Sequence, residues 1–162
     1  MKVLIVSQFF WPENFRINDL AKELNQRDHE VTVLTGIPNY PSGKWFEGYS
    51  LKSIGLERRK GITIIRVPLI PRFSSKKWQL ALNYLSFAII ASILGFFYCR
   101  EKYDIIFTYA PSPLTAAIPA VILKIFKRIP MVIWVQDLWP EVFKAVEAIQ
   151  SKLFFSLVGV MM

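Results

Sequence analysis

Four side chains with useful chemistry follow a short apolar run near the end of the sequence. Residues 131–135 contain no polar residue, and Gln136, Asp137, Trp139 and Glu141 come soon after them. A carboxylate can accept a proton from a hydroxyl, an amide can hydrogen-bond a polar ligand, and an indole offers a flat apolar surface. We therefore predict catalytic roles for Asp137 and Glu141, and substrate-binding roles for Gln136 and Trp139. In the alternative, Asp137 only caps a following helix and Trp139 belongs to the core.

The apolar run itself is typical of a strand that is buried on both faces, as in the middle of a parallel sheet. Comparable runs and helical spacings recur along the chain. The predicted strands are 2–6, 31–35, 62–67, 104–109 and 131–135, and the predicted helices are 15–27, 76–100 and 113–127. Strands that alternate with helices predict an α/β fold, a Rossmann-like doubly wound parallel sheet that forms one domain over residues 1–162.

Details of these elements can also be predicted. Asn14 is placed to cap the first helix, and Pro119 is expected to kink the third. Residues 36–60 carry several prolines and glycines, so we assign no regular element to them.

The carboxyl ends of parallel strands share one edge of the sheet, where ligands bind. The segments predicted there are rich in aromatic residues, prolines, amides and hydroxyls, which suit a ligand with apolar patches and many hydroxyl groups, such as a sugar. The predicted substrate-binding residues in these segments are Asn14, Arg16, Asn39, Tyr40 and Ser112. Arg16 begins a helix and is the candidate for holding a phosphate. In the alternative, about half of these aromatic side chains only pack beneath the loops.

Several common sites are absent from the sequence. The turn after the first strand has no glycine, no Walker loop or Gly-x-Ser-x-Gly elbow occurs, and His29 lies at the opposite predicted edge. A nicotinamide dehydrogenase, a P-loop kinase and a serine hydrolase are therefore disfavoured. The single Cys99 excludes an internal disulfide, and no metal site is predicted.

Residues 78–99 carry no charge and are long enough to cross a bilayer. The strands on either side should join one sheet, however, so we predict a crossover helix with its outer face on a membrane surface. Lys76, Lys77, Trp78 and Arg100 flank the apolar stretch and are the predicted membrane contacts. A membrane-spanning helix is the alternative.

The net charge of +8 is concentrated in one part of the chain. Residues 52–102 hold ten Lys and Arg against two acids. This excess predicts an anionic membrane surface as a partner. Nucleic acid is not predicted, because no nucleic-acid-binding motif accompanies the charge.

Six stretches together resemble a known family. They are SQFFWPENFRINDLAKEL (7–24), HEVTVLTGIPNYPSG (29–43), IIRVPLIPR (64–72), LALNYLSF (80–87), YAPSPLTAAIPA (109–120) and WVQDLWPE (134–141). In this order they resemble the N-terminal domain of GT-B glycosyltransferases of the family 4 type. Within that family the sequence is similar to bacterial O-antigen, capsule and colanic-acid fucosyl- or N-acetyl-fucosaminyltransferases.

The resemblance implies a function in cell-surface polysaccharide biosynthesis. Such enzymes transfer a sugar, with retention, from a nucleotide sugar to a lipid-linked or glycan acceptor, usually without a required metal. The resemblance places the protein in the cytoplasm, peripheral at the inner face of the plasma membrane. The N-terminal domain mainly holds the acceptor, and no cofactor is expected in it. The C-terminal domain, which binds the nucleotide sugar, is absent from this sequence, so we expect the isolated chain to be inactive.

Two departures from the family are visible. Many members have a glycine-rich turn after the first strand, which is missing here, and many have a histidine at the position of Gln136. A glutamine cannot transfer protons at neutral pH, so its role is limited to hydrogen bonding. Two alternatives remain open: a non-catalytic membrane-docked module that needs a separate donor-binding subunit, and an inactive truncated remnant.

Overall fold

The computed structural model describes residues 1–72, 76–111 and 113–136. Predicted residues Ser112, Asp137, Trp139 and Glu141 lie outside them. The strands are β1 (Lys2–Ser7), β2 (Glu30–Gly36), β3 (Gly55–Arg59), β4 (Ile62–Val67), β5 (Ile105–Ala110) and β6 (Met131–Val135). The helices are α1 (Ile17–Gln26), α2 (Lys77–Tyr98) and α3 (Ile118–Lys127), with short 3-10 turns η1 (Leu51–Ser53) and η2 (Leu114–Ala117).

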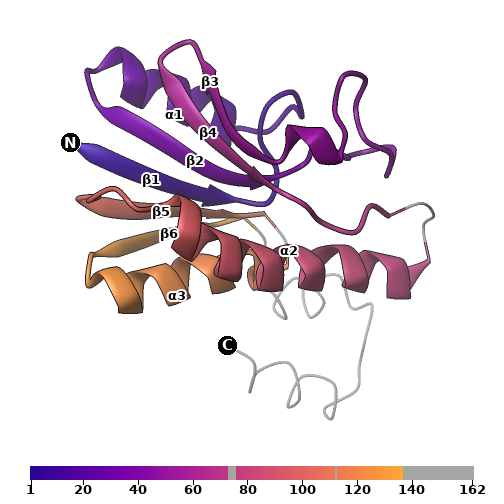
Figure 1. Ribbon diagram of the computed structural model, residues 1–162. Coiled ribbons are helices and arrows are strands. Elements are labelled where there is room, and N and C mark those ends of the chain that lie inside the picture. Colours follow the sequence, from indigo (N-terminus) through magenta and orange to yellow (C-terminus); the bar gives the residue numbers. More distant parts are fainter. Residues whose placement is uncertain (73–75, 112, 137–162) are drawn as a thin grey trace.

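The strands form one sheet in the order β3-β4-β2-β1-β5-β6 (Figure 1). Every neighbouring pair is parallel except β3 and β4, which are antiparallel. Helix α1 covers one face, and α2 and α3 lie side by side on the other (Figure 1). The predicted doubly wound α/β class is therefore confirmed.

Alternate residues of the central strands feed two separate cores, because successive side chains of a strand point to opposite faces. Val3 and Ile5 of β1 pack in the core under α1, whereas Leu4 and Val6 pack in the core under α2 and α3. All four are buried, and each contributes roughly 1.5–3 kcal/mol relative to an exposed side chain. Burial on both faces explains why these strands read as continuous apolar runs.

Helix α2 is the connection between β4 and β5, as predicted. Both strands belong to the same sheet, and α2 packs on its face with Phe87 and Ala91 fully buried. Close packing also requires Gly95, where a Cβ would approach the side chain of Leu34 on β2. The helix is apolar and long enough to cross a membrane by length and composition alone.

Two details of the helices were predicted wrongly. Helix α1 begins at Ile17 after Arg16, and Asn14 does not cap it, because no side-chain cap bond forms there. Pro119 does not kink α3 but lies in its first turn, since the preceding residues form the separate turn η2. A proline is well accommodated there because its missing N–H would have no helical partner.

Strand β3 was missed in the segment 36–60. Its sequence, GLERR, has three charged residues and only one large apolar residue, so it lacks the apolar pattern of a strand. It is an edge strand that pairs with β4 through a tight hairpin, in which Lys60 and Gly61 both have positive φ angles. Charges are common on edge strands, where one face meets water.

Strand β6 was predicted at the centre of the sheet but is the outermost strand of the described part. Val132, Ile133 and Val135 are all exposed there. The apolar run correctly indicated a strand, but composition alone does not distinguish a central strand from an outer one.

Candidate functional site

The site is built at the edge where the five parallel strands end. The segment after β1 (residues 8–16), the segment after β2 (37–50) and the segment after β4 (68–72) meet there. The amide of Gly36 donates to the carbonyl of Gln8 at 3.2 Å, and that of Ile37 donates to Val67 at 3.0 Å. These bonds bring together segments that are far apart in the sequence.

Five aromatic side chains form a connected group at this edge, which we call the aromatic cluster: Phe9, Phe15, Tyr40, Tyr109 and Trp134. The rings of Phe9 and Phe15 stack with centroids 4.8 Å apart, and Tyr40 lies 5.2 Å from Phe15. Phe15 also meets Tyr109 at 6.4 Å, and Tyr109 meets Trp134 at 5.3 Å. The cluster thus runs from the segment after β2 to the last described strand.

Members of the aromatic cluster differ in their access to solvent. Phe9 and Tyr109 are buried, whereas Tyr40 is 39% exposed. The buried rings therefore support Tyr40, Phe15 and Trp134, whose rings are partly accessible from outside. Of the aromatic residues in the segments after the strands, Phe9 and Phe10 are buried, as expected for those that pack beneath the loops.

Two arginines flank the aromatic cluster. The guanidinium of Arg72 lies 4.9 Å from the centre of the Tyr40 ring, and its Nη2 donates to the carbonyl of Pro41 at 3.2 Å. Arg16 is exposed and lines a shallow hollow together with Trp134 and residues of α1. The site therefore combines aromatic surface with positive charge at both ends.

Glu13 holds two of the edge segments together. Its carboxylate is buried and accepts hydrogen bonds from the backbone N–H groups of Tyr40 at 2.7 Å, Asn39 at 2.8 Å and Phe10 at 3.2 Å. Burial raises the pKa of Glu13 to about 7, and the three N–H donors act against that rise. This residue sets the position of Tyr40 relative to the segment after β1.

Helix α2 contacts the same edge segments through the buried side-chain amide of Asn83. Asn83 accepts a bond from Gln8 Nε2 at 2.8 Å and donates to the carbonyl of Ile70 at 2.7 Å. Its Nδ2 also lies 3.4 Å from the Oδ1 of Asn39. Ser86, one turn further, donates to the carbonyl of Asn83 and accepts from the amide of Ile70.

The predicted binding residues have different environments. Arg16 and Tyr40 are exposed at the site, and Gln136 is exposed with its Oε1 3.4 Å from the hydroxyl of Tyr109. Asn39 is buried, and its amide donates to the carbonyl of Ile37 at 3.0 Å, so the structure gives it a supporting position. Asn14 is exposed beside Glu13 in the sequence but does not cap α1.

The predicted membrane residues lie at the ends of α2. Lys76 and Trp78 are exposed at its start, where Lys77 is the first helical residue, and Arg100 is exposed just past its end. The Lys and Arg residues of positions 52–102, however, do not all lie on one surface of the protein. Arg66 lies on the α1 face of the sheet, opposite α2, because it is in line with Ile62 and Ile64 of the α1 core.

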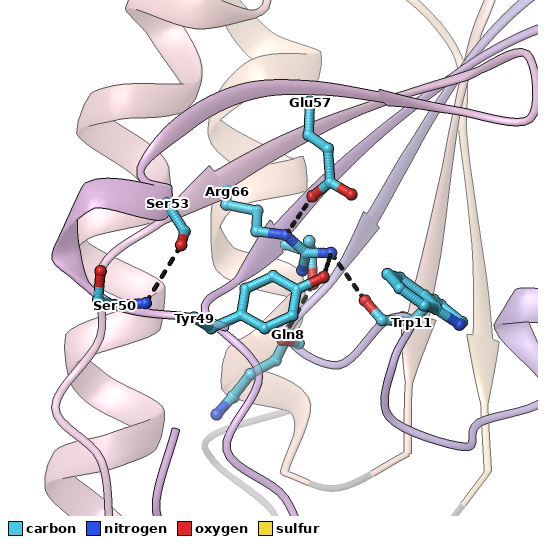
Figure 2. A network of polar contacts seen from close by, with 8 residues as sticks. Gln8, Trp11, Tyr49, Ser50, Ser53, Glu57 and Arg66 are labelled. Carbon is cyan, nitrogen blue, oxygen red and sulfur yellow. Dashed lines mark hydrogen bonds and ion pairs between the residues drawn. The ribbon is translucent and has the colours of Figure 1, made fainter. Parts of the chain in front are cut away.

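Sequence reasoning missed Glu13, Arg72 and Arg66. Arg66 is fully buried, and its Nε forms an ion pair with Glu57 of β3 at 2.9 Å (Figure 2). Its Nη2 donates to the carbonyl of Trp11 at 2.8 Å and to the hydroxyl of Tyr49 at 3.2 Å. A basic residue inside the largely apolar strand ITIIRV was the available signal, because a charge within a buried strand needs a partner.

Within the described residues, no group of three or more His, Cys, Asp or Glu side chains is arranged to hold a metal ion. The chemistry that these residues offer is stacking against sugar rings, hydrogen bonding to hydroxyls and attraction of an anionic group.

The fold is a doubly wound α/β domain, and its candidate site gathers polar and aromatic side chains at the carboxyl edge of the sheet. Residues 14–156 match the family of glycosyl transferase 4-like domains. The chain belongs to that family.

Among solved structures, the chain is similar to the C-terminal domain of a hydrogenase from Pyrococcus furiosus. The TM-score is 0.51 at 15% sequence identity, over 82% of this chain and 89% of that one. At this identity the likeness concerns the fold alone. No curated protein sequence matches the chain.

Proposed function

We propose that this chain is the acceptor-binding part of a glycosyltransferase in cell-surface polysaccharide biosynthesis. The full enzyme transfers a sugar from a nucleotide donor to a lipid-linked or glycan acceptor. The observation that carries the proposal is the aromatic cluster at the carboxyl edge, with Arg16 and Arg72 beside it. Sugar rings stack on aromatic side chains, and guanidinium groups bind phosphates or other acidic groups of an acceptor.

In this reaction the bond between the donor sugar and its phosphate breaks, and an acceptor hydroxyl oxygen forms the new glycosidic bond. The hydroxyl proton passes to a carboxylate, and the nucleotide departs with the bonding electrons. We assign Asp137 and Glu141, which follow β6 in the sequence, to positions near that hydroxyl. Gln136 orients the acceptor by hydrogen bonding. The donor is bound by a second domain, which we place in a C-terminal continuation or a separate subunit.

The first test measures binding and transfer separately. The purified chain should bind acceptor glycans by calorimetry and show no transfer from nucleotide sugars, whereas transfer should appear when a C-terminal donor domain of the same family is supplied. In that complete system, Asp137→Asn should lower kcat by at least a hundredfold without changing folding. A loss of only a fewfold would assign Asp137 to helix capping instead.

Tyr40→Ala should weaken binding of a soluble acceptor analogue by about tenfold, because it removes the exposed face of the aromatic cluster. Tyr98→Ala is the matched control, since Tyr98 is comparably exposed but lies at the far end of α2. Equal losses in both variants would contradict acceptor binding at the aromatic cluster.

A second part of the proposal concerns the membrane. The outer face of α2 carries a row of exposed apolar side chains at helical spacing: Trp78, Leu82, Leu85, Ile89, Ile93 and Phe96. Helix α3 extends this surface with Ile125 and Phe126, which are 66% and 67% exposed, and the rings of Phe126 and Phe96 are in contact at 5.4 Å. We call this surface the α2–α3 apolar face.

The α2–α3 apolar face is bordered by positive charge. Lys76 and Arg100 lie at the ends of α2, and Lys124 and Arg128 lie on and after the last turn of α3. An apolar surface with a cationic border suits the interface of an anionic bilayer. We therefore propose that the protein is peripheral at the cytoplasmic face of the plasma membrane. Because Asn83 of α2 contacts the edge segments, this orientation keeps the acceptor site near the bilayer, where a lipid-linked acceptor would lie.

A further inference from the structure

A second hollow lies beside the outer strand β3, between that strand and the segment that precedes it. Six residues give it its chemical character: Trp11, Tyr49, Lys52, Ser53, Glu57 and Arg59. None of them belongs to the aromatic cluster. Trp11, however, follows Phe9 by two residues in the segment after β1, so the hollow and the aromatic cluster share one supporting segment.

Arg66 connects three residues that line this hollow, Trp11, Tyr49 and Glu57 (Figure 2). Its guanidinium bonds Glu57 on β3, the carbonyl of Trp11 and the hydroxyl of Tyr49, and it lies 4.7 Å from the centre of the Tyr49 ring. Arg66 is fully buried, and all three contacts are made within the protein without any ligand. The lining is therefore preorganised, and a ligand would lose little affinity to ordering the protein.

The hollow has a positive charge balance. Glu57 is the one acid among its described lining residues, and that carboxylate is already paired with Arg66. Lys52 and Arg59 are exposed, and no ion pair joins either of them to an acid in the described part of the chain. An anionic group that enters the hollow thus meets two cations whose charge is not neutralised locally.

Aromatic surface and hydroxyl groups accompany the charge. The guanidinium of Arg59 lies 3.3 Å from the centre of the Trp11 ring, which holds Arg59 along the hollow. Trp11 and Tyr49 are each half-buried, so part of each ring remains accessible. Burial raises the pKa of Tyr49, and its hydroxyl therefore stays protonated and can donate at neutral pH.

We propose that this hollow is a subsite for an acidic sugar residue of the acceptor glycan. The carboxylate or phosphate of that residue lies between Lys52 and Arg59, and its ring lies against Trp11 and Tyr49. This inference rests on the proposed function, because it requires that the chain binds a glycan acceptor.

The test is calorimetric titration of the chain with four probes. They are a short hexuronate oligosaccharide, a neutral oligosaccharide of the same length, a hexose phosphate and inorganic phosphate. Arg59→Gln should weaken binding of the hexuronate and hexose phosphate by about tenfold, because a charge-assisted bond is lost, and should leave the neutral glycan unaffected. NMR shifts of the Trp11 indole N–H should follow the acidic probes.

Arg58→Gln is the matched control. It removes the same charge from the same strand, but Arg58 pairs with Thr63 and lies on the opposite face of the sheet from Arg59, which pairs with Ile62. Binding of the acidic probes should therefore remain as in the unmodified chain.

Four results would overturn the subsite. Equal losses in Arg58→Gln and Arg59→Gln would show only general attraction by surface charge. Inorganic phosphate bound as tightly as the sugar probes would show an anion site without sugar recognition. Binding of the acidic probes that depends on Tyr40 but not on Arg59 would remove this subsite and leave the proposed function standing. No binding of any glycan by the unmodified chain would contradict the proposed function as well.

Discussion

At the scale of single residues, Glu13 is the side chain on which the candidate site most depends. Its Oε1 accepts from the backbone N–H groups of Asn39 and Tyr40, which connects the segment after β1 to the segment after β2. The sequence alone gives no reason to expect this connection. In the sequence, Glu13 is an acid in a loop between Pro12 and Asn14, and such acids are mostly solvated. Only the packing of two loops reveals that it is buried.

The burial of Glu13 has a measurable consequence for stability. Its pKa is about 7 in the folded protein, against an ordinary value of 4.5, so between these values the folded state holds a proton that the unfolded state has lost. The contribution of Glu13 to the free energy of unfolding is therefore fully present below pH 4.5 and is lost as the pH rises through 7. A shift of this size corresponds to about 3 kcal/mol.

Glu13→Gln removes this titration while it keeps one carbonyl oxygen for the amides of Asn39 and Tyr40. In urea denaturation, the free energy of unfolding of the variant, relative to the unmodified chain, should rise by about 2–3 kcal/mol from pH 5 to pH 8. A difference that stays constant, or that falls, would mean that the three N–H donors outweigh burial and keep Glu13 ionised throughout.

At the scale of elements, α2 shows how an apolar segment long enough to span a membrane can instead pack on the face of a sheet. Asn83 and Ser86 interrupt its apolar sequence three residues apart, and both are buried against the edge segments. The apolar residues Leu82, Leu85 and Ile89 lie on the opposite side and are exposed. This helix is therefore polar on the side that contacts the edge segments and apolar on the side that faces away from the sheet.

Asn83→Ala should lower the free energy of unfolding by about 2–3 kcal/mol, because Gln8 and the carbonyl of Ile70 would lose their buried partner. Leu82→Ala, at the neighbouring exposed position, should change it by less than about 0.5 kcal/mol. The free energies of unfolding of both variants are measured by chemical denaturation. Equal effects would indicate that the amide bonds add nothing beyond the packing of the helix.

At the scale of the whole molecule, the sequence predicted the fold class and most of the elements. Strands buried on both faces, such as β1 and β2, are evident as apolar runs. Strand β3 was missed because its charged sequence lacks the apolar pattern of a buried strand, and β6, the outermost strand of the described part, was predicted at the centre because apolar runs carry no information about strand order. The aromatic cluster lies at the edge where the site was predicted, but the roles of Arg66 and Glu13 depend on contacts between distant segments.

The arrangement of layers also determines which surface is left for a membrane. Helix α1 is amphipathic and has its buried face on the sheet, whereas α2 and α3 pack apolar residues against the other face of the sheet and also expose apolar side chains on their outer side. The outer side of that layer is the α2–α3 apolar face, which therefore belongs to the molecule as a whole and not to α2 alone. The sequence prediction had included α2 and omitted α3.

This surface predicts lipid-dependent flotation of the chain. It should float with anionic liposomes at low salt, be largely released at high salt, and bind neutral liposomes weakly, because screening removes the attraction to anionic lipid. The double variant Ile125→Ser and Phe126→Ser should reduce the bound fraction at least tenfold, since each exposed side chain contributes about 1–2 kcal/mol when it enters the interface. Leu51→Ser is the control, because Leu51 is also exposed but lies in η1, near β3. Flotation that is indifferent to lipid charge, or an equal loss in the control, would exclude the α2–α3 apolar face as the membrane contact.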